Sequence, residues 1–186
     1  MSLRTFLLGG YWPDPYADPA IITTPKGPLA VRPLTPVDAE LARAFIDRLS
    51  PESRYFRFFQ SFRKVPQSLL DRLVSCDTTN GMALVAVAAD AGTQRIVGEI
   101  RYCANSAADE ADIAVAVDDD WQFLGVGRSL LERIENAARK NGVHHLKGDV
   151  LAANEKMLQF ARNRGFQLSP DQNDRRLFRI AKTLTA

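Results

Sequence analysis

The 186-residue sequence has few cysteines, little net charge and no long apolar run, and each shortage excludes a class of protein. Its two cysteines, Cys76 and Cys103, are too few for a disulfide framework or a multi-cysteine zinc site, which favours a reducing, cytoplasmic compartment. The 24 Lys and Arg against 22 Asp and Glu leave a formal charge of +2, too small for a general electrostatic hold on nucleic acid. No apolar run approaches the ~18 residues that span a bilayer, so we expect no membrane association. Hydrophobic residues at 46% and charged residues at 25% are instead typical of a globular domain.

Residues 1–28 differ in composition from the rest of the chain. They contain five of the ten prolines together with Tyr11, Trp12 and Tyr16, and they show neither helical nor strand periodicity. This pattern predicts an extended arm over 1–28 and a folded domain over 29–186. The aromatic rings of the arm are expected to cover a surface, either on the domain itself or on a partner.

Apolar periodicity predicts an α+β domain after the arm. A short strand is expected at 29–34, followed by three helical segments whose start signals are Thr35, Ser50 and Pro66. The later elements are expected to be strands at 82–89, 96–104 and 112–117, a helix at 125–141, a strand at 145–150, a helix at 154–164, and strands at 166–169 and 176–180. The short connections between the first three of these strands favour an antiparallel meander, and the whole order predicts a mixed sheet flanked by helices.

The second helical segment, 54–62, carries four aromatic residues at helical spacing. They are Tyr55, Phe58, Phe59 and Phe62. Basic residues between them could indicate an RNA-binding surface, but the helical spacing favours one aromatic stripe that packs in the core.

Residues 112–128 indicate an anion-binding site. An apolar strand ends in three aspartates, and Gly125 and Gly127 then lie directly ahead of a long amphipathic helix. The start of a helix leaves main-chain N–H groups unpaired, and glycines let a phosphate approach these groups closely. Arg128 adds a positive charge at the same place.

Two well-known phosphate loops fit this pattern poorly. A P-loop requires a Gly-Lys-[Ser/Thr] ending, which the sequence after Gly125 lacks. The dinucleotide fingerprint requires a third glycine where Leu130 stands, and it requires parallel strands ahead of the loop. One feature does fit, because Asp149 follows the loop at about the sequence separation expected of a ribose-binding acid. An NAD(P) site is therefore the less favoured alternative.

The loop instead resembles the pyrophosphate loop of the GNAT superfamily of N-acetyltransferases, Gln/Arg-x-x-Gly-x-Gly/Ala. A second pattern of that family, Asn-x-x-[Ala/Met]-x-x-[Phe/Leu] followed by Gly-Phe, also has a counterpart. The matching residues are Gln122, Gly125 and Gly127 for the first pattern and Asn154, Met157, Phe160, Gly165 and Phe166 for the second. The segment 49–59, Leu-Ser-Pro-Glu-Ser-Arg-Tyr-Phe-Arg-Phe-Phe, is similar to the helical lead of bacterial protein lysine acetyltransferases of the Pat type, and the likeness covers about 29–180.

This resemblance implies a GNAT fold that holds acetyl-CoA in a V-shaped gap between splayed strands. It implies that the protein transfers an acetyl group to an amine and uses no metal. The acceptor would be a lysine of a protein or a small amine, and the enzyme would be a monomer or a homodimer. The alternative from another functional class is a protein that binds acyl-CoA as a sensor without catalysing a reaction. The implied cofactor contacts are Val115, Val117, Gln122, Leu124, Gly125, Val126, Gly127, Arg128 and Asn154.

The resemblance also implies a catalytic carboxylate at the start of the strand. The Pat-type pattern Glu-Ala-Glu-Phe-Ala-Val is similar to residues 110–115, in which Asp112 stands in place of the catalytic glutamate. Its side chain is one methylene shorter, so we expect a bridging water. If Asp112 is not the catalytic carboxylate, Glu110 and Glu99 are the substitutes, the next candidates for this role.

Two positions depart from the family pattern. Phe123 replaces a common loop glycine, and Ala161 replaces a frequent general-acid tyrosine. The second departure is tolerable, because a thiolate of pKa ~8.5 lies only about 2 kcal/mol uphill at pH 7 and water can protonate it.

Other candidate groups have simpler explanations. His144 and His145 are adjacent, so in a strand they would point to opposite faces and could not chelate one metal ion. Ser129 and Cys103 have no histidine partner in a readable motif, so no covalent nucleophile is expected. The aspartates 118–120 could attract a cationic acceptor, but a solvated turn is favoured.

Overall fold

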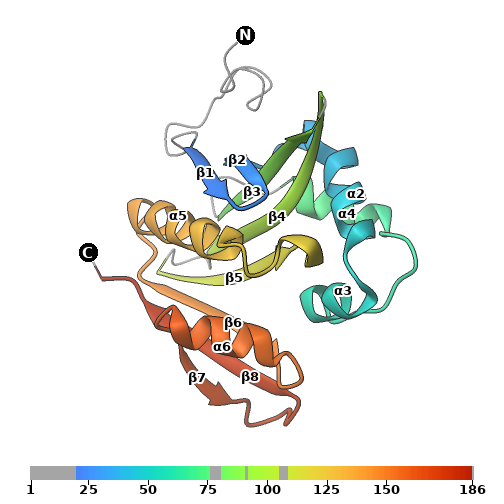
Figure 1. Cartoon of the computed structure of the whole chain (residues 1–186). Coiled ribbons are helices and arrows are strands. Elements are labelled where there is room, and N and C mark those ends of the chain that lie inside the picture. The colour runs from blue at the N-terminus through green and yellow to red at the C-terminus, as the bar shows by residue number, and fades with distance from the viewer. Residues whose placement is uncertain (1–19, 76–80, 91, 105–108, 186) are drawn as a thin grey trace.

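The computed structural model describes residues 20–75, 81–90, 92–104 and 109–185. Within these ranges, eight strands form one sheet in the order β1-β2-β3-β4-β5-β6-β8-β7 (Figure 1). The strands are β1 (Ala20–Thr24), β2 (Gly27–Pro33), β3 (Gly81–Asp90), β4 (Thr93–Ala104), β5 (Glu110–Val117), β6 (His145–Leu151), β7 (Gln167–Pro170) and β8 (Leu177–Thr183). Neighbouring strands are antiparallel except β5 and β6, which are parallel, so the predicted α+β class with a mixed, mostly antiparallel sheet is confirmed.

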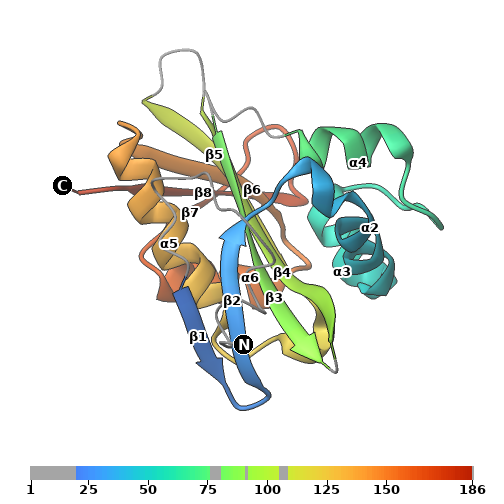
Figure 2. The same cartoon turned by 90° about the horizontal axis from the view of Figure 1, so that it is seen from above.

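Helices cover both faces of this sheet, as Figure 2 shows. They are α2 (Ala39–Arg48), α3 (Pro51–Phe58), α4 (Gln67–Val74), α5 (Val126–Lys140) and α6 (Glu155–Asn163), with 3₁₀ turns η1 (Pro36–Asp38) and η2 (Asp119–Trp121). Along β3, Leu84 and Ala86 belong to the core beneath α5, whereas Val85 and Val87 belong to the core beneath α2 and α4. Side chains of a strand alternate between faces, so the sheet is the middle of three layers.

The sheet begins with a hairpin that the sequence pattern does not predict. Residues 20–28 are expected in an arm, but β1 and β2 pair from Ala20↔Val31 to Thr24↔Gly27. The prolines obscure the strand signal, yet an edge strand needs hydrogen bonds on one side only. The predicted arm is therefore wrong for 20–28, while residues 1–19, which include Tyr11, Trp12 and Tyr16, lie outside the described residues.

The three predicted helix starts are confirmed. The Asp38 carboxylate accepts hydrogen bonds from the Thr35 amide at 2.9 Å and the Thr35 hydroxyl at 2.8 Å, in η1 just ahead of α2. The Ser50 hydroxyl accepts from the Ser53 amide at the start of α3, and α4 begins directly after Pro66. Local capping signals therefore placed these helices correctly.

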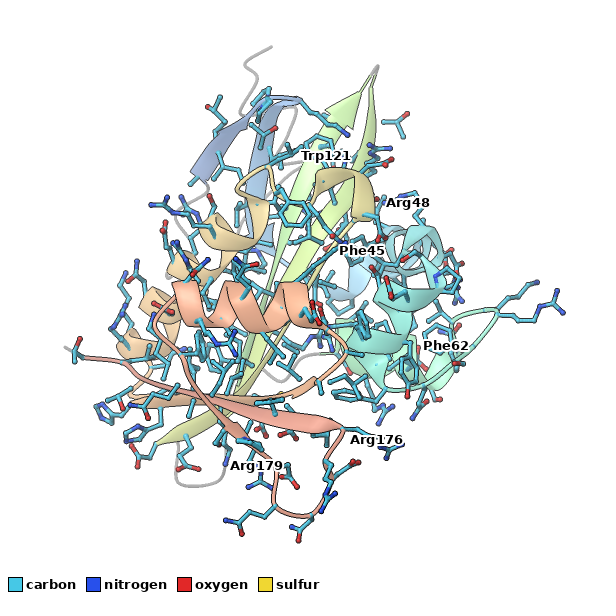
Figure 3. The ribbon with its side chains drawn as sticks, turned by 60° about the horizontal axis from the view of Figure 1, so that its bottom comes forward. Phe45, Arg48, Phe62, Trp121, Arg176 and Arg179 are labelled. Atoms are coloured by element: carbon cyan, nitrogen blue, oxygen red, sulfur yellow. The ribbon has the colours of Figure 1, made fainter. Side chains whose placement is uncertain are left out.

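The aromatic stripe is only partly in the core. Phe58 and Phe62 (the latter labelled in Figure 3) pack against the core beneath α2 and α4, with ring centroids 5.5 Å apart. Tyr55 and Phe59 are instead 39% and 43% exposed. The helix ends because Phe59 adopts a left-handed conformation with φ of 53°, so the predicted helical spacing does not continue to residue 62. The expectation that all four rings are buried is wrong for Tyr55 and Phe59.

A buried ion pair joins β2 to η1. The Arg32 guanidinium donates to both oxygens of Asp38, at 2.7 and 2.5 Å, and the two side chains are 8% and 4% exposed. We expect Asp38→Ala to lower the free energy of unfolding by ~3–5 kcal/mol at pH 7, because it leaves a buried guanidinium unpaired. Urea unfolding measures the loss, with Glu40→Ala, whose side chain is 86% exposed, as the control.

The effect of Asp38 should depend on pH. Burial raises the pKa of Asp38, but the hydrogen bonds from Arg32 and Thr35 outweigh burial and hold that pKa below its ordinary value of 3.8. The stabilisation is therefore complete above the ordinary value and is lost as the pH falls through the lower native value. The difference between wild type and Asp38→Ala should shrink in acid, and a constant difference would contradict this account.

Candidate functional site

Strands β5 and β6 separate part of the way along the sheet. Their parallel pairing ends at Asp112↔Lys147. Beyond this point β5 remains paired with β4 as far as Val117, and β6 remains paired with β8 as far as Leu151. Each strand keeps its outer neighbour while the two part from each other, so the backbone of the sheet opens as a V with its apex at Asp112.

Main-chain donors of β5 point into this V. The Asp118 amide donates to the Val97 carbonyl, on the β4 side, at 2.9 Å. Successive N–H groups of an extended strand point to opposite edges, so those of Val117 and Val115 point away from β4 and toward β6. These are the two strand residues that the resemblance assigns to the cofactor.

A second group of donors lies where β5 leads into α5. Within the described residues, the main-chain amides of 123–128 have no hydrogen-bond acceptor, whereas the Ser129 amide already donates to the Gly125 carbonyl at 3.0 Å. Consecutive unpaired N–H groups at the positive end of a helix dipole make an anion-binding site. These amides belong to the segment in which the sequence predicts an anion-binding site.

Glycines allow the start of α5 to lie close to the sheet. Gly125 has a φ of 86°, which glycine adopts without strain, and it precedes the first residue of the helix. A Cβ on Gly98 of β4 would lie 2.9 Å from Val126, so only a glycine lets the helix approach this closely. The start of the helix is thereby held against the end of the strand that lines the V.

Gln122 and Phe123 shape the loop itself. The Gln122 side-chain amide donates to the Val117 carbonyl at 3.3 Å, which ties the loop to the end of β5. Phe123 is 84% exposed with a φ of 61°, and the Lys156 ammonium lies 5.8 Å from its ring centroid. Phe123, which stands where the resembling family commonly has glycine, thus has a left-handed backbone, a conformation that favours glycine.

The other predicted cofactor residues lie at the open end of the V. Leu124 packs against the core beneath α5. Arg128 is exposed and pairs with Glu132 at 2.7 Å, so its guanidinium is engaged along the helix. Asn154 lies beyond the end of β6, where its side-chain oxygen accepts from the Met157 amide at 3.1 Å. The V is thus bounded by these residues on both arms.

Asp112 is the exposed carboxylate at the apex, and it has no hydrogen-bond partner among the described residues. Glu110, two residues earlier, pairs with Lys147 at 2.7 Å, and this hydrogen bond holds the pKa of Glu110 below its ordinary value. A carboxylate that is already paired with a cation is a weaker base.

Glu99, the other substitute, is buried between two arginines. Arg101 donates to it at 2.5 Å and Arg57 at 3.2 Å. Burial raises the pKa of Glu99, but the charges of Arg101 and Arg57 outweigh burial and lower it. Glu110 and Glu99 thus both hold ion pairs, whereas Asp112 stands opposite Lys147 in the register without a hydrogen bond to it.

The face of β5 that carries Asp112 is lined by small side chains. Alternation along the strand places Ala114 and Ala116 on this face, and the register sets them opposite Arg101 and Glu99 of β4. Helix α3 contacts β5 and lies on the opposite side of the sheet from α5 (Figure 2). Asp112 therefore lies on the α3 side of the sheet, where β5 carries only small side chains beyond it.

Of the three aspartates that follow β5, only the first is buried. Asp118 is buried and pairs with Arg48 of α2 at 3.3 Å (Figure 3). Asp119 accepts from the Ser50 amide at 2.9 Å and the Ser53 hydroxyl at 2.7 Å. The solvated-turn interpretation is wrong for Asp118, because Arg48 of α2 supplies a partner for it in the interior. Asp119 and Asp120 are exposed as expected, and Asp119 is also hydrogen-bonded to the start of α3.

Two arginines of α3 were not singled out by the sequence pattern. Arg57 has a side chain only 12% exposed, and Arg54, one turn earlier, is half-buried. Their positions could have been found from spacing. Arg54 and Arg57 are three residues apart on a helix, and Glu99 and Arg101 are two apart on a strand, so each pair lies on one face of its element.

Other chemistries have less support in the structure. The antiparallel order from β2 to β5 excludes the doubly wound sheet of an NAD(P) site, and Asp149 lies 4.0 Å from Arg179. The described part of the chain holds no group of three or more His, Cys, Asp or Glu side chains placed to bind a metal ion. Among the helices of the described ranges, none combines the length and apolarity needed to cross a membrane.

Comparison with known proteins relates this arrangement to acetyltransferases. A family model described as the acetyltransferase (GNAT) family matches residues 44–166. Acetyltransferase PA5475 of Pseudomonas aeruginosa is 36% identical over 153 residues, which cover 81% of this chain and 82% of that protein.

Solved structures share the fold. The GNAT domain of S. lividans PAT has a TM-score of 0.81 and 28% identity, with 94% of this chain and 100% of that chain covered. A cAMP-binding acyltransferase from Mycobacterium smegmatis has a TM-score of 0.63 and 21% identity, with 98% of this chain but only 50% of that chain covered.

The family match includes the elements that build the V. Residues 44–166 contain β5, the loop of unpaired amides, α5, β6 and α6. The loop of unpaired amides and the parting strands are therefore within the matched region, and the chain belongs to the GNAT acetyltransferase family.

Proposed function

We propose that the protein transfers an acetyl group from acetyl-CoA directly to an amine, in the first place the side chain of a protein lysine. The observation that carries this proposal is the parting of β5 from β6 beside the unpaired amides of 123–128. The diphosphate of the cofactor would bind these amides, and its pantetheine arm would follow Val117 and Val115. From Val117 to Asp112 a strand rises by ~17 Å, which suits an extended pantetheine arm that ends with its thioester at the apex.

The chemistry at the apex requires a base more than an acid. A lysine ammonium of pKa ~10.4 must lose a proton before attack, which costs about 4.6 kcal/mol at pH 7. Asp112 would accept this proton, directly or through one water, and the amide of Val115 would polarise the thioester carbonyl as charge develops on its oxygen. The amine nitrogen then forms the new bond to the acetyl carbon, and CoA leaves as a thiolate that water can protonate.

Two observations support a lysine of a protein as the acceptor. The segment 49–59 resembles the helical lead of Pat-type lysine acetyltransferases, and the GNAT domain of S. lividans PAT superposes on nearly the whole chain. In the structure this segment includes α3, which borders the face from which an acceptor can approach Asp112.

The proposal is tested by cofactor binding and product formation. Acetyl-CoA at 100 times its Kd should stabilise the native state by about 2.7 kcal/mol, which a thermal shift detects. Mass spectrometry then detects acetylated product from lysine peptides and from small amines such as polyamines. Absence of any shift would contradict the proposal, and a shift without product from either group would favour an acyl-CoA sensor.

Asp119 is expected to position α3 for the acceptor. Its carboxylate ties the start of α3 to the segment that enters the cofactor loop, through Ser50 and Ser53. We expect Asp119→Ala to raise the KM for the amine about 3- to 10-fold, the equivalent of roughly 1 kcal/mol of lost capping, with little change in the Kd for acetyl-CoA. Asp120→Ala, an exposed neighbour, is the control; an equal rise in both variants would contradict this role.

A further inference from the structure

A buried cluster of charge lies beneath α3, on the same face of the sheet as Asp112. Arg57 and Arg101 flank Glu99, and the three side chains are only 12%, 12% and 9% exposed. Glu99 and Arg101 stand opposite Ala116 and Ala114 in the register. The cluster therefore borders the face from which the acceptor approaches.

This cluster has more cationic than anionic groups. The Arg54 guanidinium, one helical turn before Arg57, has no acceptor or ion-pair partner among the described residues. The Nε atoms of Arg54 and Arg57 are both fully buried and unpaired. Glu99 is a single carboxylate against the two guanidinium groups of Arg57 and Arg101, and Arg54 lies on the same helix as Arg57. Burial lowers the pKa of Arg57 although Glu99 raises it.

Nearby carboxylates do not compensate this charge. Asp118 is paired with Arg48, and Asp119 is bound by the serines at the start of α3. A buried guanidinium nitrogen without an acceptor is costly, so an acceptor oxygen of a ligand would be favoured at the Nε atoms of Arg54 and Arg57. The planar fork of a guanidinium suits a carboxylate, which can accept two parallel hydrogen bonds.

We propose that the acceptor amine belongs to a molecule that also carries a carboxylate, and that Arg54, supported by Arg57, binds this carboxylate. The inference rests on the proposed acetyl transfer to an amine and narrows its substrate class. The carboxylate can be an acidic residue beside the lysine of a peptide or the carboxylate of a free amino acid. A strongly basic stretch around the lysine would be disfavoured by the same cluster.

Two matched pairs of acceptors test this inference. Nα-acetyl-lysine is compared with its carboxamide, and a blocked Gly-Lys-Glu-Gly peptide is compared with Gly-Lys-Gln-Gly. We expect wild-type kcat/KM to be about tenfold or more higher for the carboxylate member of at least one pair, mainly through KM, which is the size of a charge-assisted hydrogen bond. The pair that shows the preference identifies the source of the carboxylate.

Arg54→Gln should bring the preference close to one. Arg54 has no hydrogen-bond or ion-pair partner among the described residues, so its replacement breaks no such contact there. Arg63→Gln, at an exposed position after α3, should keep the wild-type preference. Equal kcat/KM within both pairs in the wild type, or an unchanged preference in Arg54→Gln, would overturn the inference while leaving acetyl transfer intact.

Binding without turnover separates this inference from the proposed function. If wild type binds acetyl-CoA but acetylates none of the four acceptors, Nα-acetyl-norleucine and its carboxamide are titrated by NMR, since neither has a side-chain amine. Binding that requires the carboxylate and is lost in Arg54→Gln would support the anion site although the transfer reaction fails. Equal binding of the two ligands would overturn it.

Discussion

Gly127→Asp is expected to keep the protein folded and to abolish useful affinity for acetyl-CoA. Gly127 is the second residue of α5, and a Cβ there would meet Val117 and Phe160 at ordinary contact distances of 3.6 and 3.7 Å. A carboxylate in the first turn is favourable to the helix dipole, and replacing a helical glycine adds up to ~1 kcal/mol. The same carboxylate would repel the diphosphate, so we expect the Kd for acetyl-CoA to rise ~100-fold or more, about 3 kcal/mol of lost and repulsive contacts.

Gly127→Ala is the matched control for this variant. It removes the glycine without adding charge, and the family pattern that the loop resembles accepts alanine at this position. We expect a similar gain in the thermal midpoint of the free protein and an affinity within a few-fold of wild type. Calorimetric titration with acetyl-CoA measures both variants, and equal affinity for the cofactor in Gly127→Asp and Gly127→Ala would place the diphosphate elsewhere.

Asp112→Asn should slow acetyl transfer by ~100- to 10,000-fold at pH 7, the usual contribution of a general base. The Kd for acetyl-CoA should not change, because the side chain lies at the apex and not at the diphosphate loop. The defect should diminish as the pH approaches the pKa of the acceptor amine, since a growing fraction of the amine no longer needs a base. Initial rates across this pH range, with a lysine peptide as acceptor, measure the effect.

Glu110→Gln separates this role from general effects of removing charge near the apex. Glu110 is on the same strand but is paired with Lys147, so its replacement should change the rate only a few-fold. If Asp112→Asn transfers acetyl at the wild-type rate at every pH tested, Asp112 is not the base. A large loss in Glu110→Gln alone would assign the role to the substitute.

The parts of the site that could be predicted from the sequence are those encoded by consecutive residues. Thr35 and Ser50 mark helix starts through capping, and the glycines 125 and 127 mark a loop that opens onto a helix. The meander of β3, β4 and β5 follows from alternation and short connections. Each of these signals depends on a few neighbouring residues, so no knowledge of packing was required.

The errors concern residues whose surroundings come from elsewhere in the chain. Tyr55 was expected inside but is 39% exposed, whereas Arg57, which the sequence pattern did not single out, pairs in the interior with Glu99 of β4. Asp118 was expected in water, but Arg48 of α2 pairs with it in the interior. In both cases the hydrophobic pattern was outweighed by a charged or polar partner that the local sequence does not show.

The order of residues is enough to specify a mixed α+β domain in which a helix starting near Gly125 presents unpaired amides to an anion. Three features depend on segments that only the tertiary structure brings together. They are the separation of β5 from β6 after Asp112, the ion pairs of Glu110 and Glu99, and the absence of a partner for Arg54 among the described residues. The difference arises because capping and turn signals act over a few residues, whereas strand separation and ion pairing depend on groups that are far apart along the chain.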